Sequence, residues 1–307
     1  MQIGVLAKRD SWHYRDLERA VGGRHALASI SYSQLTSSVM RDGVEASSSG
    51  TDLAILDALL VRTMPPGTLE QVVFRMDVLG QLHQRGLAVV NSPKAVECSV
   101  DKYLTTAQLQ RAGLNVPRTI ACQTVENAMA AFESLGGDVV VKPLFGGEGR
   151  GIERIRDAIA TRSMFSTMAE TGSVFYLQEF VPHEGADLRL LVIGDDVFGI
   201  RRRSNGDWRT NISCGGVAEA IEVSAKLAAT AHKAAQATGA VFAGVDLLPG
   251  NDGSLYVLEV NASPGWKALA AATGVDIADR VLQLLCSEAK MKPAASSRVL
   301  PSPIPAP

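Results

Sequence analysis

Residues 139–151, VVVKPLFGGEGRG, join a run of valines and one lysine to a glycine-rich loop. The run from Val139 to Val141 favours a β-strand, because β-branched side chains fit a pleated sheet. The glycines permit sharp turns and let backbone N–H groups approach an anion closely, as in phosphate-binding loops. The spacing matches neither G-x-x-x-x-G-K-[ST] nor G-x-G-x-x-G. The stretch therefore predicts a strand followed by a phosphate-facing loop of a different kind.

Length, charge and cysteine spacing limit the possible functions. The 307 residues suffice for two or three domains, and nearly half are apolar, as in α/β enzymes. A net charge of −2 predicts no affinity for nucleic acid or anionic membranes, and no apolar run is long enough for a signal or membrane segment. The four cysteines are far apart, which argues against disulfides and zinc: Cys98, Cys122, Cys214 and Cys286. We therefore expect a cytoplasmic protein.

The first ninety residues alternate between strand-like and helix-like segments. Strands are predicted at Gln2–Ala7, Ala26–Tyr32, Leu53–Val61 and Leu87–Asn91. Helices are predicted at Ser11–Val21 and Thr68–Gln84, the second with an apolar stripe of Leu69, Val72, Val73, Met76, Leu79 and Leu82. This order predicts an open parallel sheet that ends near Asn91-Ser92-Pro93.

The remainder of the chain interleaves helices with hairpins. Helices are predicted at Val100–Ala112 with Ser99 as cap, Val125–Leu135, Ser224–Thr238 and Val275–Leu285. Strands are predicted at Phe175–Val181, Asp187–Ile193 and Val197–Arg201, and at the segments VFAGVDLL and LYVLEVNA. Beyond Lys290 the Pro, Ser and Ala content predicts a disordered tail. The pattern indicates mixed or antiparallel sheets, α+β in character.

Three oxygen-bearing side chains interrupt two apolar strands that a hairpin loop joins. Glu259 and Asn261 are two residues apart and so project from one face, and Asp246 lies on the neighbouring strand. Such groups are costly to bury without a partner, and carboxylate and amide oxygens suit magnesium. Carboxylates satisfied by lysine or backbone donors would produce the same pattern. The sequence leaves these two explanations open.

Basic side chains supply candidate anion ligands. Lys142 ends the valine strand just before the glycine loop, where a bound phosphate is a natural partner. Taken alone, Lys102 is best interpreted as a solvent-exposed lysine of a helix. Arg189 and the group Arg201–Arg203 could grip phosphate or carboxylate, or could form an ordinary solvated turn. Their number is too small to indicate nucleic-acid binding.

Taken in order, these motifs carry a family resemblance. From about Asn91 to Leu285 the chain resembles the ATP-grasp superfamily, and within it the RimK group of carboxylate–amine ligases, with EVNASPG after GVDLL as the most specific part. The resemblance implies that a carboxylate is phosphorylated by ATP and that an amine then attacks the acyl phosphate, with Mg or Mn as the metal. Positioning and charge neutralisation suffice for such chemistry. A closing loop would keep water from the acyl phosphate.

The resemblance also implies roles for individual residues. It implies ATP binding by Lys102, Lys142, Gly147, Gly149, Gly151, Gln178, Glu179, Phe180, Val181, Asp187 and Arg203. It implies metal binding by Asp246, Glu259 and Asn261. It places Arg203, Arg209 and Asn211 near the γ-phosphate and the acceptor, as catalytic residues. FGGEGRG would be the flap over the phosphates, with Glu148 and Arg150 as its polar tips.

The resemblance implies an ATP-grasp fold of α/β and α+β character. We expect a Rossmann-like N-terminal domain at 1–92, a central lid at 93–183, a metal-carrying C-terminal part at 184–290 and a tail at 291–307. A homo-oligomer is expected. A nicotinamide oxidoreductase is disfavoured, because IGVLAKRDSW has one glycine where three are needed.

Two departures from the RimK pattern bear on the acceptor. The chain has TNISCGG where RimK proteins usually show SNLHRGG, so that Ser213 and Cys214 replace a basic pair, and its flap differs from the commoner GTQG form. We therefore expect the substrates to be ATP, L-glutamate and a small carboxylate acceptor such as a tetrahydromethanopterin-type pterin. The alternatives are glutamylation of a protein C-terminus and a non-catalytic ATP-binding regulator.

Overall fold

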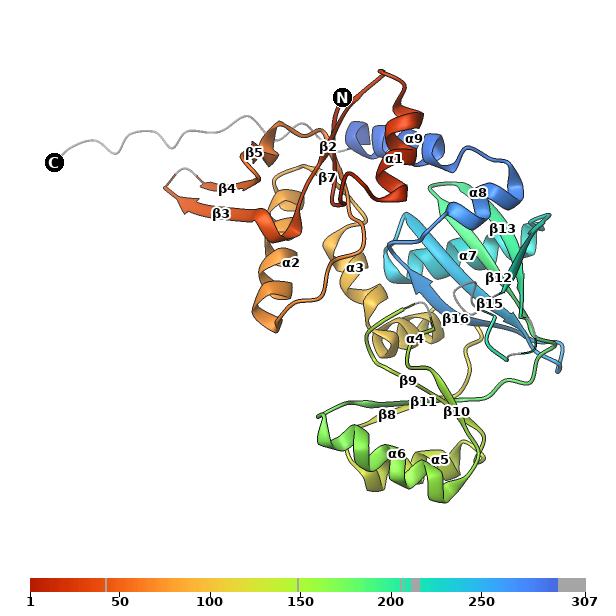
Figure 1. Cartoon of the computed structure of the whole chain (residues 1–307). Helices are drawn as coiled ribbons and strands as arrows, with labels where there is room; N and C mark the ends of the chain where they lie inside the picture. The colour runs from red at the N-terminus through yellow and green to blue at the C-terminus, as the bar shows by residue number, and fades with distance from the viewer. Residues whose placement is uncertain (42, 148, 205, 207, 211–215, 292–307) are drawn as a thin grey trace. The chain divides into compact units, whose positions relative to one another are not determined.

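The computed structural model describes residues 1–41, 43–147, 149–204, 206, 208–210 and 216–291 (Figure 1). By their internal contacts these residues form two compact units. The first comprises Met1–Pro93 and the segment from Ala278 onward, and the second comprises Lys94–Ile277. The three-part division expected from the sequence stays a prediction.

The first unit contains a parallel sheet. Its strands β1 (Gln2–Val5), β2 (Ala26–Ser29), β6 (Ala58–Leu60) and β7 (Ala88–Val90) lie in the order β2-β1-β6-β7, and every neighbouring pair is parallel. The central strands β1 and β6 and the edge strand β7 are almost wholly buried, as in a covered parallel sheet, whereas the edge strand β2 is partly exposed. The predicted open parallel sheet is confirmed.

Helices α1 (Trp12–Val21), α2 (Leu69–Gln84) and α9 (Ile277–Met291) accompany this sheet. Ser11 caps α1, and Gly22 ends it in the left-handed conformation that favours glycine. Thr68 and Gln71 form a capping box at the start of α2. The predicted apolar stripe of α2 is wrong in its first half, because Leu69 and Val73 are exposed there.

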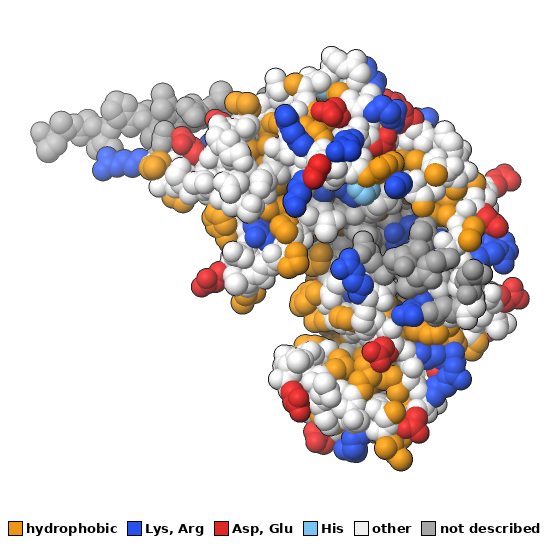
Figure 2. All heavy atoms as spheres, viewed as in Figure 1, with side chains coloured by type: hydrophobic (Ala, Val, Ile, Leu, Met, Phe, Trp, Pro, Cys, Tyr) orange, Lys and Arg blue, Asp and Glu red, His pale blue; other side chains and the backbone are white. Residues whose placement is uncertain are grey.

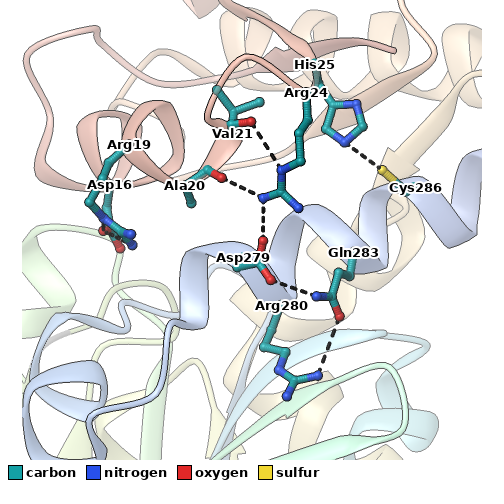
Figure 3. A network of polar contacts seen from close by, with 10 residues as sticks. All are labelled: Asp16, Arg19, Ala20, Val21, Arg24, His25, Asp279, Arg280, Gln283 and Cys286. Atoms are coloured by element: carbon teal, nitrogen blue, oxygen red, sulfur yellow. Dashed lines mark hydrogen bonds and ion pairs between the residues drawn. The ribbon is translucent and has the colours of Figure 1, made fainter.

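A polar network connects α9 to the end of α1 (Figure 3). The Nη2 atom of Arg24 donates to the Ala20 carbonyl at 2.7 Å and to Oδ1 of Asp279 at 2.5 Å. Arg24 thereby satisfies a carbonyl at the C-terminal end of α1, where a positive charge also complements the helix dipole. His25 Nε2 lies 3.5 Å from Cys286 Sγ in the same network. Helix α9, which the sequence predicts in the C-terminal part, thus belongs to the first unit from Ala278 onward.

The segment between β2 and β6 differs from the prediction. It contains the 3₁₀ turn η1 (Tyr32–Gln34) and an antiparallel sheet of β3 (Leu35–Met40), β4 (Gly43–Ser48) and β5 (Thr51–Asp52). The strand predicted from Leu53 is wrong at its start, because η2 (Leu53–Ile55) forms there with Asp52 as its N-cap. An Asp side chain that accepts a backbone N–H two residues on favours a turn over a strand.

The second unit begins with two helices instead of one. α3 (Pro93–Val100) ends before Asp101, whose side chain caps α4 (Lys102–Arg111) by accepting from the Leu104 N–H at 3.0 Å. The predicted single helix capped by Ser99 is therefore wrong at its start. Asp101 is the better cap because its oxygen reaches the free N–H groups of the first turn. The correction places Lys102 at the first position of α4.

A four-stranded antiparallel sheet follows in the order β10-β9-β11-β8. The strands are β8 (Thr119–Cys122), β9 (Val139–Lys142), β10 (Glu153–Ile155) and β11 (Phe175–Glu179). Helices α5 (Val125–Ser134) and α6 (Ala158–Glu170) pack against it around a core that includes Phe132, Phe165 and Phe175. The opening stretch is therefore a strand, β9, joined to β10 by the glycine loop.

A five-stranded antiparallel sheet completes the unit in the order β14-β13-β12-β15-β16. Its strands are β12 (Ala186–Ile193), β13 (Asp196–Arg203), β14 (Val217–Ile221), β15 (Phe242–Pro249) and β16 (Leu255–Asn261). Helix α7 (Ala225–Thr238) contacts β12, β15 and β16, and α8 (Lys267–Thr273) contacts β13 and β14. Both predicted hairpins, β12–β13 and β15–β16, are confirmed.

The surface is mixed in charge. On the face shown in Figure 2, the described Lys and Arg side chains are interspersed with Asp and Glu, in keeping with the small net charge. Each helix among the described residues is too short or too polar to cross a lipid bilayer.

Candidate functional site

One face of the five-stranded sheet carries a row of polar side chains. Directly opposed residues of antiparallel strands share a face, and the register opposes Arg202 with Asp187, Arg189 with Asp246, and Asp246 with Glu259. Asn261 pairs with Gly244 two positions along β15 from Asp246, and therefore lies on this face too. The row runs across four strands: Arg202, Asp187, Arg189, Asp246, Glu259 and Asn261. We call this set the polar row.

The centre of the polar row is a buried charge network. Arg189 donates through Nε and Nη2 to the two oxygens of Asp246, both at 2.6 Å. Arg202 donates to Asp187 at 2.7 and 2.5 Å, and its Nη2 also lies 3.0 Å from Asp246 Oδ2. Burial raises the pKa of Asp246, but the two guanidiniums outweigh it and lower that pKa to about 2. Asp246 is therefore fully ionised at neutral pH.

Glu259 and Asn261 lie on β16, beside a β-bulge. The register of β15 and β16 shifts between Asp246 and Leu247, so that Glu259 opposes Asp246 while Val257 opposes Leu247. Bulges often re-aim a side chain beside an active site. Asn261 Oδ1 accepts the Ser263 N–H at 2.8 Å, which fixes its amide. Both side chains are half-buried, in reach of solvent and ligand.

The oxygen set Asp246, Glu259 and Asn261 fits magnesium in kind, since two carboxylates and one amide oxygen are hard ligands on adjoining strands. Within the described ranges, no group of three His, Cys, Asp or Glu side chains has a metal-binding arrangement. Asn261 would therefore have to supply the third protein oxygen. Both oxygens of Asp246 already accept bonds from arginines, so a metal at this carboxylate would compete electrostatically with the two guanidiniums.

Lys142, at the end of β9, belongs to a network of neutral groups. Its Nζ donates to Gln178 Oε1 at 2.5 Å. Gln178 Nε2 donates to Thr119 Oγ1 at 3.1 Å and to the Tyr176 hydroxyl at 3.3 Å, and that hydroxyl lies 2.8 Å from Thr106 Oγ1. Burial lowers the pKa of Lys142 to about 8. The charge of Glu259 opposes this lowering, and the charge of Lys102 adds to it. The ammonium is thus held by an amide instead of a carboxylate.

Lys102 connects α4 to the glycine loop. Its Nζ donates to the Gly146 carbonyl at 2.7 Å, and its backbone N–H donates to the Leu144 carbonyl at 3.3 Å. Burial lowers the pKa of Lys102, and the nearby carboxylates Glu259 and Asp101 oppose that effect. Both predicted phosphate lysines therefore lie in the electrostatic neighbourhood of Glu259.

The glycine loop is open at its tip and tight at its end. A Cβ at Gly146 or Gly147 would meet nothing within 4 Å, whereas one at Gly151 would lie 2.9 Å from Pro143 Cγ. Gly146, Gly149 and Gly151 have positive φ angles of 124°, 74° and 68°, which other residues rarely adopt. The predicted polar tip Glu148 lies outside the described residues.

A pocket lies beside the segment predicted to bind adenine. Lys142, Gln178, Glu179, Phe180 and Val181 line it together with apolar side chains, which are Val140, Leu248 and Leu258. The pocket opens to solvent, and its cavity volume is about 50 Å³. An apolar slot with a few polar groups is the usual form of a small-molecule site. The structure thus brings together one cation and most of the predicted hinge.

The hinge side chains are held by two arginines that the sequence reasoning missed. Arg118 donates from its backbone N–H and from Nε to the two oxygens of Glu179, at 2.8 and 2.5 Å. Arg154 forms two bonds to Asp138, at 2.7 and 2.5 Å, and its Cζ lies 3.2 Å from the centroid of the Phe180 ring. Because its carboxylate is engaged, Glu179 offers its backbone to a ligand more readily than its side chain.

Of the predicted catalytic residues, Arg203 lies away from the polar row. Arg203 lies on the opposite face of β13 from Arg202, is exposed, and pairs with Glu219 at 3.7 Å. Arg209 lies in the described segment 208–210 after β13, and Asn211 lies outside the described residues. The arginine of this run that belongs to the polar row is Arg202. Alternation along β13 could have identified it, since Arg202 opposes Asp187 in the β12–β13 hairpin.

Comparisons with known proteins agree with this geometry. Residues 99–285 match the family model of the RimK-like ATP-grasp domain. The tetrahydromethanopterin:alpha-L-glutamate ligase of Methanosarcina acetivorans is 35% identical over 263 residues, covering 76% of this chain and 81% of that protein. A Vibrio cholerae protein named "Probable alpha-L-glutamate ligase" is 30% identical over 298 residues, covering 95% of this chain and 97% of that one.

A solved structure extends the likeness to nearly the full length. The ATP-grasp ligase PsnB, complexed with a minimal precursor, superposes with a TM-score of 0.75 at 25% identity, covering 93% of this chain and 98% of that one. The fold expected from the sequence is confirmed. The chain belongs to the RimK-like ATP-grasp family.

Proposed function

We propose that this protein joins L-glutamate to a carboxylate of a small pterin-type acceptor, with Asp246, Glu259 and Asn261 as ligands for Mg²⁺ and Lys102 and Lys142 as ligands for the phosphates of ATP. As a member of its family, the chain is an ATP-dependent, ADP-forming amide-bond ligase. The observation that carries the site assignment is that Glu259, at the end of the polar row, acts electrostatically on two half-buried lysines, Lys102 and Lys142.

The reaction has two balanced steps. An oxygen of the acceptor carboxylate attacks the γ-phosphorus of ATP and ADP leaves, which forms an acyl phosphate. The glutamate nitrogen then attacks the acyl carbon, phosphate leaves and the nitrogen loses a proton. The ammonium groups of Lys102 and Lys142 neutralise the phosphate oxygens and hold them in line. Bound magnesium would supply further charge neutralisation at the same oxygens.

The remaining predicted residues have supporting roles in this proposal. Phe180 and Val181 would contact adenine in the pocket beside β11, and the backbone of Glu179 would contact its polar edge. Asp187 would act through Arg202, which it holds by two bonds. Arg203 and Arg209, with Asn211 outside the described residues, remain candidates for the acceptor end.

The glycine loop is proposed to close over the phosphates and exclude water. Lys102 donates to the Gly146 carbonyl of this loop, so a phosphate that takes the ammonium would free the loop from that contact. Limited proteolysis tests this proposal. Cleavage between Gly146 and Gly151 should be slowed by Mg²⁺ and a non-hydrolysable ATP analogue, and equal cleavage with and without them would contradict it.

The names of the relatives support the substrate. The 35%-identical relative is a tetrahydromethanopterin:alpha-L-glutamate ligase, which favours glutamate and a pterin acceptor. PsnB was solved with a precursor peptide, which favours a peptide carboxylate as the second candidate. A cytoplasmic location, a homo-oligomeric state and the absence of nucleic-acid partners stay predictions.

The test combines ADP release with product mass. Purified protein is incubated with ATP, Mg²⁺, glutamate and a panel that contains a pterin acceptor and a peptide. We expect ADP and a pterin product heavier by one or more glutamyl residues. Glu259→Gln should abolish both, whereas Glu133→Gln, at an exposed carboxylate of α5, should retain them. A folded protein that releases no ADP with any acceptor would contradict the proposal.

A further inference from the structure

The proposed metal ligand Asp246 is bonded to two arginines. Arg189, directly opposite on β12, occupies both of its oxygens at 2.6 Å, and Arg202 reaches Oδ2 at 3.0 Å. Two guanidiniums beside one carboxylate leave little negative charge to attract a divalent cation, and they also repel the cation. Metal binding at Asp246 therefore competes with these arginines.

The two arginines are held differently. Arg202 is anchored by two bonds to Asp187, and its side chain is 4% exposed. Withdrawing it would leave the Asp187 carboxylate buried without its cation, at a large cost. The side chain of Arg189 is 19% exposed, and among the described residues both of its side-chain hydrogen bonds go to Asp246. Arg189 is the member that can leave without leaving a second buried carboxylate unpaired.

Glu259 differs from Asp246 in its charged neighbours. It opposes Asp246 from β16, and no guanidinium of the described part of the chain bonds to it, while Lys102 and Lys142 are its electrostatic neighbours. An incoming phosphate would satisfy those lysines and would also offer oxygens to a guanidinium released from Asp246. Arginine binds phosphate oxygens as readily as carboxylate oxygens.

We propose that Arg189 guards Asp246: it occupies the carboxylate while the site lacks nucleotide, and it transfers to an anionic oxygen of the substrates when metal takes the carboxylate. This inference depends on the proposed role of Asp246 as a metal ligand. Since linkage is reciprocal, nucleotide must tighten metal binding by the same factor by which metal tightens nucleotide binding. The guard thus disfavours metal binding before ATP arrives.

The probe is Mn²⁺ alone, added to nucleotide-free protein and measured by the electron paramagnetic resonance signal of the unbound ion. We expect Arg189→Gln to bind Mn²⁺ about tenfold tighter than the wild type, within the usual range of coupling between sites. Arg201→Gln is the matched control, because Arg201 is exposed on the other face of the sheet. It removes the same charge and should bind Mn²⁺ as the wild type does. Adding Asp246→Asn to Arg189→Gln should remove the gain.

Equal Mn²⁺ affinity of Arg189→Gln and the wild type would overturn the guard, and so would an equal gain in Arg201→Gln. If Arg189→Gln fails to fold, Arg189→Lys serves, because its ammonium retains the charge but loses the two-bond grip. Its gain in affinity should be smaller but measurable, and no gain would again overturn the guard. ADP release is scored separately. A wild type that forms ADP without any gain in the variants refutes only the guard, whereas a gain without ADP formation refutes only the ligase.

Discussion

The two sheets of the second unit bury cations in opposite ways. In the five-stranded sheet, Arg189 and Arg202 each bind carboxylates directly. In the four-stranded sheet, Lys142 donates to the neutral amide of Gln178, and the carboxylate of Glu259 acts only through space. The first arrangement is electrically closed, whereas the second leaves a positive charge under-neutralised.

The contrast appears in the pKa values. Arg189 and Arg202 outweigh burial and lower the pKa of Asp246 to about 2, so its charge is firmly held. Burial lowers the pKa of Lys142 to about 8, because no bonded carboxylate compensates the lost solvation. An under-neutralised buried ammonium beside a pocket is a site that an anion would stabilise. The comparison therefore predicts a structural role for Arg202 and anion binding by Lys142.

Removing a cation from the arginine–carboxylate network of the five-stranded sheet should have the largest effect on stability. Arg202→Met removes the cation from two buried carboxylates and should lower the free energy of unfolding by about 3–5 kcal/mol. Urea denaturation measures this change. Arg201→Met, one residue along on the exposed face, should lower it by less than about 0.5 kcal/mol. A similar small loss in both variants would show that the charge network is not structurally important.

Removing the Lys142 ammonium of the four-stranded sheet should affect activity instead of stability. Lys142→Met should lower kcat/KM for ATP by about 10²- to 10³-fold, as loss of one preorganised donor to a reacting group does. Its free energy of unfolding should fall by no more than about 1 kcal/mol, because only the neutral bond to Gln178 is lost. Lys226→Met, at an exposed position of α7, is the control and should retain full activity. Full turnover in Lys142→Met would refute the phosphate role.

The stability contribution of Lys142 should depend on pH. Its folded pKa of about 8 lies below the unfolded value of 10.5, so the unfolded chain binds the proton more tightly between these two pH values. The free energy of unfolding of the wild type, relative to Lys142→Met, should therefore rise as pH increases from about 8 to 10.5. The rise should be at most roughly 3 kcal/mol. A flat difference across this range would mean that Lys142 is neutralised by a partner.

The smallest expected effect comes from giving the Lys142 ammonium a bonded carboxylate. The kcat/KM of the wild type for ATP should decline above pH 8 or so, as the free enzyme loses the Lys142 proton. Gln178→Glu places a carboxylate at the 2.5 Å contact and should move this decline upward by about one pH unit. Gln178→Met, which adds no charge, should not move it upward. An unchanged decline in Gln178→Glu would assign the pH dependence to another group.

Much of this contrast could be predicted from local sequence. The spacing of Glu259 and Asn261, and the hairpin that brings Asp246 beside them, follow from strand alternation and turn residues. Lys142 at the end of three valines was predictable for the same reason. These features depend on neighbouring residues alone, and the structure places them as expected.

The rest depends on register and on weak patterns. Arg202 and Arg203 differ by one position, which in a strand exchanges the faces of the sheet, so only the register shows that Arg202 is the one in the polar row. Helix α6 buries few side chains, among them Thr161 and Phe165, and its Ser and Thr content weakens the helical pattern. The Arg189–Asp246 pair joins strands 57 residues apart, which no local pattern encodes.

The most direct test of the account follows oxygen through the reaction. The acceptor carboxylate is labelled with ¹⁸O, and the phosphate released during glutamate ligation is examined by mass spectrometry. Phosphoryl transfer to that carboxylate predicts one ¹⁸O atom in each inorganic phosphate, together with ADP. Unlabelled phosphate, or AMP and pyrophosphate in place of ADP, would contradict the account.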